Sequence, residues 1–101
     1  MMKLTVLYPH PTDPAQFDAY YRETHTPLVH KIPGLVRFED AHVVATPDGS
    51  PPPYFLIAEL YFDNMESFQA GMASPEGQAT AADVPNFASN GATLMICDIT
   101  S

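Results

Sequence analysis

The chain has 101 residues, 46% hydrophobic and 16% charged, which suits one folded domain over residues 1–101. Its formal net charge is −8, with four Lys and Arg in total, so it lacks the clustered cations that bind nucleic acid or anionic membranes. One cysteine excludes an internal disulfide, and no apolar run approaches the roughly 20 residues of a membrane span, so we expect a cytoplasmic protein.

The N-terminal segment predicts a strand followed by a helix. Residues 3–8 alternate between two faces, with the apolar side chains of Leu4 and Val6 on the same face. Asp13 can cap a helix whose first position is Pro14. A β-α unit is therefore expected at the start of the chain.

The predicted first helix carries a stripe at helical spacing that should pack on the sheet. The stripe runs from Phe17 through Tyr21 and His25 to Leu28. Pro27 disfavours helical geometry at the residue before it, so we expect the helix to weaken or kink around His25.

The middle of the chain predicts a long hairpin. Residues 35–46 form a strand candidate, and the proline-rich segment 47–53 cannot continue a sheet. Residues 54–62 form the next strand candidate, which is apolar on both faces apart from Glu59. One face of the first of these strands mixes apolar and polar side chains: Phe38, Asp40 and His42.

The last third predicts a helix that starts at a capping box in residues 63–66 and ends at Ser74-Pro75, a short helical piece over 76–83, and a final strand over 92–99. The order β-α-β-β-α-β predicts an α+β, ferredoxin-like fold, with a four-stranded antiparallel sheet and both helices on one face. Two of the strands are apolar on both faces. The free face of the sheet should therefore be covered by a second copy of the chain or enclose a ligand.

His25 is the candidate for chemistry because histidine titrates near neutral pH and this one ends an apolar stripe. Tyr21, one helical turn earlier, is the candidate partner hydroxyl. The alternative is a purely structural pair: a helix-terminal histidine bonded to backbone and a tyrosine packed in the core.

Other side chains are candidates for lining a pocket because they lie on the helix stripe, on a strand face that mixes polar and apolar residues, or in a loop after Pro85 that could reach the pocket. They are Phe17, Leu28, Phe38, Asp40, His42, Glu59, Asn86 and Phe87. The four histidines lack the spacing of a metal site, and no glycine-rich phosphate-binding motif is present, so we expect no metal and no tightly bound cofactor.

The Phe-x-x-Tyr and His-x-Pro-Leu pattern over residues 17–28, followed by Ile-Pro-Gly-Leu at 32–35, resembles the EthD family, named for ethyl tert-butyl ether degradation. Residues 54–63, 74–77 and 85–87 are also similar to that family. The resemblance implies a dimeric α/β barrel in which two sheets pack face to face around a pocket.

The resemblance favours a function for His25 and leaves three hypotheses. The first is an enzyme without a tightly bound cofactor that performs acid–base chemistry on a small apolar or aromatic oxygenated compound. The second is a non-catalytic accessory protein that holds such a compound for an oxygenase or degradation system. The third is a monooxygenase, either cofactor-free or using haem. Relatives with this fold catalyse many different reactions, so the family name does not choose among them.

Overall fold

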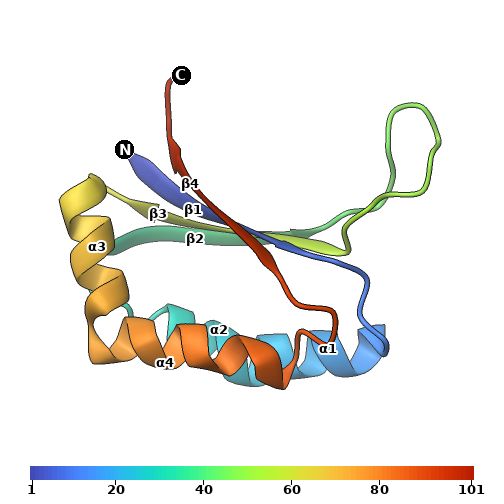
Figure 1. Ribbon diagram of the computed structural model, residues 1–101, viewed down its shortest axis with the longest axis horizontal. Coiled ribbons are helices and arrows are strands. Elements are labelled where there is room, and N and C mark those ends of the chain that lie inside the picture. Colours follow the sequence, from blue (N-terminus) through green and yellow to red (C-terminus); the bar gives the residue numbers. More distant parts are fainter.

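The computed structural model describes residues 1–101 and contains the predicted β-α-β-β-α-β order (Figure 1). Its strands are β1 (Met2–Tyr8), β2 (Leu35–His42), β3 (Leu56–Phe62) and β4 (Thr93–Asp98). They form one antiparallel sheet in the order β2-β3-β1-β4. The helices cover one face of this sheet, which confirms the ferredoxin-like α+β fold (Figure 1).

The helical layer has two parts. The first runs continuously through α1 (Pro14–Tyr20), the π-helix η1 (Tyr21–His25) and α2 (Thr26–Val29). The second comprises α3 (Met65–Ala73), α4 (Pro75–Asp83) and the 3₁₀ turn η2 (Val84–Asn86). None of these helices has the length and apolar character needed to cross a membrane.

The first helix departs from α geometry up to His25, in line with the expected weakening there, but it does not end at Pro27. Thr26 keeps helical geometry, with φ −55° and ψ −43°, and its N–H donates to the carbonyl of Tyr21. This bond, from residue i to i−5, closes a π turn, which is wider than an α turn. Pro27 follows in the first turn of α2, where its missing N–H costs little. The helix therefore passes the proline by widening rather than by ending.

The core lies between the sheet and the helices. Along β1, Leu4, Val6 and Tyr8 point into it, and the alternate residues of β3 do the same. The outer face of the sheet is mixed rather than apolar, which corrects the expectation of two apolar faces. It holds polar contacts between Lys3 and Glu59 and between Tyr61 and Glu39.

The edge strand β4 is left partly uncovered by the helices. Leu94 and Ile96 pair with the inward-facing residues of β1, yet they are 54% and 53% exposed. The connection between β2 and β3 projects as a long loop from the end of the sheet at which β4 begins (Figure 1). Apolar surface that belongs to the core side of the sheet is thus open to solvent along β4.

Candidate functional site

His25 is held inside the protein by a contact between the two parts of the helical layer. It closes the π-helix η1 and is only 3% exposed. Its Nδ1 atom lies 2.9 Å from Oδ2 of Asp83, which is the last residue of α4 and is also buried. A π turn is a frequent feature of functional sites because it redirects side chains within a helix.

Asp83 has a hydrogen-bond donor for each carboxylate oxygen. Its Oδ1 accepts the Tyr20 hydroxyl at 2.6 Å and the Asn86 amide at 3.0 Å, and its Oδ2 faces His25. Burial raises the pKa of this carboxyl, but the bonds from Tyr20, Asn86 and His25 outweigh burial, so the pKa is lowered overall. Asp83 is therefore an ionised carboxylate at neutral pH.

The carboxylate of Asp83 fixes the tautomer of His25. An ionised carboxylate only accepts hydrogen bonds, so Nδ1 of the imidazole must carry the hydrogen. Burial lowers the pKa of His25, and Asp83 opposes that shift only in part. The ring is consequently neutral at pH 7, and the lone pair on Nε2 is available to take a proton.

An apolar cavity of about 40 Å³ lies between the sheet and the helices, and His25 is part of its wall. Every side-chain nitrogen and oxygen that is sealed from solvent has a hydrogen-bond partner. Nε2 of His25 has no such partner, so this atom is accessible. We therefore place Nε2 at the surface of the cavity. The exposed residues Ala81 and Leu94 also line the cavity, which places its mouth between α4 and β4.

An aromatic cluster supports the ring of His25. The Phe87 ring lies 4.5 Å from the imidazole, measured between centroids, and the Tyr21 ring lies at 5.2 Å. Phe17 stacks on Tyr21 at 5.7 Å with an interplanar angle of 8°. These contacts restrict the rings before any ligand arrives.

Tyr8 and Tyr21 are buried residues that add two hydroxyl groups to the site. Tyr8 is 2% exposed and Tyr21 5% exposed, and neither hydroxyl has a hydrogen-bond partner. Both side chains line the cavity. Burial raises the pKa of each phenol, and the charge of Asp40 adds to both shifts, so both hydroxyls keep their protons and can donate them in hydrogen bonds.

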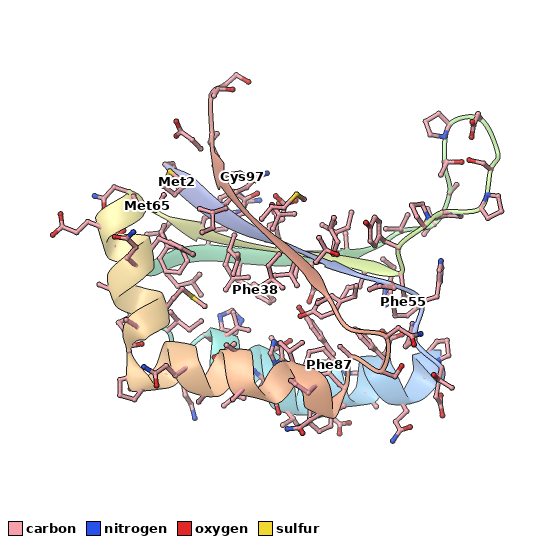
Figure 2. The ribbon with its side chains drawn as sticks, in the orientation of Figure 1. Met2, Phe38, Phe55, Met65, Phe87 and Cys97 are labelled. Carbon is pink, nitrogen blue, oxygen red and sulfur yellow. The ribbon has the colours of Figure 1, made fainter.

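The structure gathers part of the predicted set around His25. Tyr21 and Phe38 line the same cavity as His25. Phe38 extends from β2 toward the helical layer, and Phe87 lies beside the end of α4 (Figure 2). Phe17 and Phe87 support the aromatic cluster, and Asn86 contributes through its bond to Asp83.

Asp40 and His42 lie in a neighbouring groove of about 310 Å³ rather than in the cavity. There Nε2 of His42 is 2.8 Å from Oδ1 of Asp18, and both side chains are partly exposed. Tyr21 lines both the groove and the cavity, so it forms the wall between them.

Of the eight predicted lining residues only Phe38 lines the cavity, and Glu59 and Leu28 lie away from both the cavity and the aromatic cluster. Glu59 is on the outer face of the sheet, where its carboxylate pairs with Lys3, because it alternates with the inward-facing residues of β3. Leu28 faces a shallow surface hollow beside Lys31 and α4. Leu28 belongs to α2, one turn beyond the π-helix, and its side chain does not face the sheet.

Sequence reasoning did not identify Asp83 or Tyr8 as site residues. The sequence contained one signal for Asp83. An acidic residue near the C-terminal end of a helix is disfavoured by the helix dipole, so a hydrogen-bond donor is expected beside it. No group of three or more His, Cys, Asp or Glu side chains in the structure could hold a metal ion.

Comparison with known proteins identifies the family of the chain. Residues 9–91 match the sequence model of the EthD domain. The chain belongs to the EthD family. An uncharacterized 11.0 kDa protein from the thcB–thcC intergenic region of Rhodococcus erythropolis is 46% identical, covering 97% of this chain and 94% of the relative. An EthD family protein from Bacillus halodurans is 40% identical over 99% of both chains, with a TM-score of 0.92.

More distant structures share the EthD fold. A dimeric ferredoxin-like protein from Thermobifida fusca has a TM-score of 0.70 at 16% identity, covering 97% of this chain and 90% of its own. A mutant of SnoaB, a cofactor-independent oxygenase from Streptomyces nogalater, has a TM-score of 0.64 at 15% identity, covering 99% and 92%. At these identities the likeness concerns the fold alone.

Proposed function

We propose that this EthD family member is an enzyme that performs acid–base chemistry on a small apolar or aromatic oxygenated compound, with His25 as the group that moves the proton. The observation that carries the proposal is the buried pair of His25 and Asp83, which leaves Nε2 free on an apolar cavity. A neutral buried imidazole next to a carboxylate is a competent general base near pH 7.

Each part of the pair has a distinct task in this proposal. Asp83 holds the imidazole in the Nδ1–H tautomer and stabilises the imidazolium that forms when Nε2 takes a proton. Tyr20 and Asn86 hold the carboxylate of Asp83 in place and keep it ionised. His25 would contact the substrate, whereas Asp83, Tyr20 and Asn86 would position the imidazole of His25.

The cavity restricts the kind of compound that can enter. Apart from His25, Tyr8, Tyr21 and Thr80, its wall is apolar, so an uncharged and mostly hydrocarbon ligand suits it. At about 40 Å³ it holds only a few water molecules, so a ligand must displace side chains at the mouth. Met72 lines the cavity and has a flexible side chain that can yield.

A cofactor-independent oxygenase is the second candidate. It is favoured by the same apolar cavity with a buried base, because a substrate carbanion or phenolate formed by His25 would itself supply the electrons to molecular oxygen. The oxygenase from Streptomyces nogalater has the same fold. In both candidates the first step is removal of a proton by His25.

The experiment is a nuclear magnetic resonance titration of the four histidines with and without acetophenone, a neutral aromatic ketone that serves as the probe. Saturation with acetophenone should change the pKa of His25 and leave that of His42 unchanged, because His42 lies in a separate groove. A response of His42 alone would mean that the groove is the binding site. A ligand that binds in the cavity without moving the pKa of either histidine would favour an accessory protein that only holds its ligand.

The assembly proposed with this function is a homodimer. Leu94 and Ile96 leave apolar surface exposed along β4, beside the mouth of the cavity. A second copy packed there would remove this surface from water, at roughly 25 cal/mol per Å² of apolar area. The related fold from Thermobifida fusca is described as dimeric.

A further inference from the structure

We propose that Tyr8 and Tyr21 form a two-donor site for one oxygen atom of the substrate, and that this oxygen is a neutral carbonyl oxygen. The inference deepens the proposed function by naming a substrate class: an apolar ketone or aldehyde with an acidic C–H bond next to its carbonyl. The two hydroxyls would hold the oxygen while His25 acts on the neighbouring carbon.

The first support is the state of the two hydroxyls. Both side chains are more than nine-tenths buried, and neither hydroxyl has a partner within the protein. Because no sealed side-chain oxygen lacks a hydrogen-bond partner, each hydroxyl reaches accessible space, where a ligand can accept from it. Tyr8 lines the cavity and no other hollow, and its unsealed hydroxyl therefore opens onto the cavity that also contains His25.

The second support is the relative position of the rings. The centroids of Tyr8 and Tyr21 lie 5.8 Å apart, with the ring planes at 80°, and Tyr21 lies next to His25. Phe17 and Phe87 pack on both tyrosines and restrict their rotation. Two fixed donors beside a base are the arrangement that stabilises charge developing on an oxygen atom.

The third support concerns the charge of the ligand. The negative charges of Asp40 and Asp83 act on the two phenols. Burial is the main cause of the raised pKa of each phenol, the charge of Asp40 adds to both shifts, and that of Asp83 adds to the shift of Tyr8. The chain carries a net charge of −8, and no Lys or Arg lines the cavity. A ligand carboxylate would therefore be repelled, whereas a neutral carbonyl would accept both hydrogen bonds without that cost.

The chemical step follows from this placement. Nε2 of His25 takes the proton from the carbon next to the carbonyl, and the electron pair of the broken C–H bond forms a C=C bond. The C=O π pair moves to oxygen, where the hydroxyls of Tyr8 and Tyr21 stabilise the enolate through hydrogen bonds. The imidazolium then returns the proton to carbon, so atoms and electrons balance without a further reactant.

The test compares three probes of similar shape: acetophenone, ethylbenzene, which lacks the oxygen, and benzoate, which carries a charge. Dissociation constants are measured by nuclear magnetic resonance for the wild-type protein and for Tyr8→Phe, Tyr21→Phe and Tyr61→Phe. Tyr61 is the matched control because its hydroxyl bonds to Glu39 on the outer face of the sheet.

We expect Tyr8→Phe and Tyr21→Phe each to weaken acetophenone about 3- to 10-fold, the usual worth of one hydrogen bond, and to leave ethylbenzene within about twofold. Tyr61→Phe should change neither, and benzoate should bind the wild type at least about tenfold more weakly than acetophenone. Equal losses for acetophenone and ethylbenzene, no loss for either, tighter binding of benzoate, or no binding of acetophenone at millimolar concentration would overturn the inference. If the variants fail this test while acetophenone still shifts the pKa of His25, the hydroxyl pair is wrong and the acid–base function stands.

Discussion

Nδ1 of His25 lies 2.9 Å from Oδ2 of Asp83, although 58 residues separate them along the chain. One residue comes from a π turn and the other from the last position of α4, so the contact exists only when the two parts of the helical layer are packed together. The contact links folding to chemistry: it stabilises the junction of the helices and decides which nitrogen of the imidazole faces the cavity.

Replacing Asp83 by Asn should lower the pKa of His25 further, because the carboxylate that favours the imidazolium is removed while burial remains. The free energy of unfolding should fall by about 1–3 kcal/mol, since Tyr20 and His25 lose a charged acceptor. Titration of the His25 ring by nuclear magnetic resonance measures the first effect and urea unfolding the second. Tyr20→Phe is the matched control, because it keeps the carboxylate and should not lower the pKa of His25; a rise in that pKa in Asp83→Asn would contradict the account.

Acid should destabilise the protein in a way that depends on His25. Its pKa is lowered on folding from an ordinary value of 6.5, so below about pH 6.5 the unfolded chain binds more protons than the folded protein. The contribution of His25 to stability is therefore fully present above pH 6.5. It is lost as the pH falls from 6.5 to below the lowered pKa of the folded state. The free energy of unfolding, measured from pH 8 to 5, should change less with pH in His25→Asn than in wild type, and an equal slope in the two proteins would contradict this account.

Glu59 should be dispensable for the site. It lies on the outer face of the sheet, and its ion pair with Lys3 is partly exposed. Glu59→Gln should change the free energy of unfolding by less than about 1 kcal/mol. It should also leave the pKa of His25 and the affinity for acetophenone unchanged. A measurable shift of either quantity would show that the outer face communicates with the cavity.

The homodimer makes β4 the edge to test. Ile96→Lys places a charge on an apolar side chain that is 53% exposed in the single chain, so the fold should survive while the dimer dissociates. Val44→Lys is the control, because Val44 is 89% exposed in the loop away from β4. Light scattering at micromolar concentration should give a dimer for wild type and Val44→Lys and a monomer for Ile96→Lys. A wild-type monomer at that concentration would exclude the proposed assembly.

The sequence was sufficient for the order of elements and for the stripe that carries Tyr21 and His25, because period and capping are local properties. It did not predict the π turn, since the effect of Pro27 on its neighbours depends on hydrogen bonds along the whole helix. The role of Asp83 could not be predicted from local sequence, because it depends on a contact with a residue 58 positions away along the chain. Glu59 was misplaced because an apolar strand alone does not show which face meets the helices.

The central claim is that Nε2 of His25 moves a proton to and from a ligand in the cavity. The most direct measurement is the exchange of the methyl hydrogens of acetophenone for deuterium in D2O, followed by proton nuclear magnetic resonance. The wild-type protein should accelerate this exchange over buffer, and His25→Ala should lower the accelerated rate by a factor of about 10²–10⁴ while circular dichroism shows an intact fold. His42→Ala should exchange at the wild-type rate, because His42 lies in the separate groove. Exchange that is no faster than in buffer, or that is equally fast in His25→Ala, would contradict the claim.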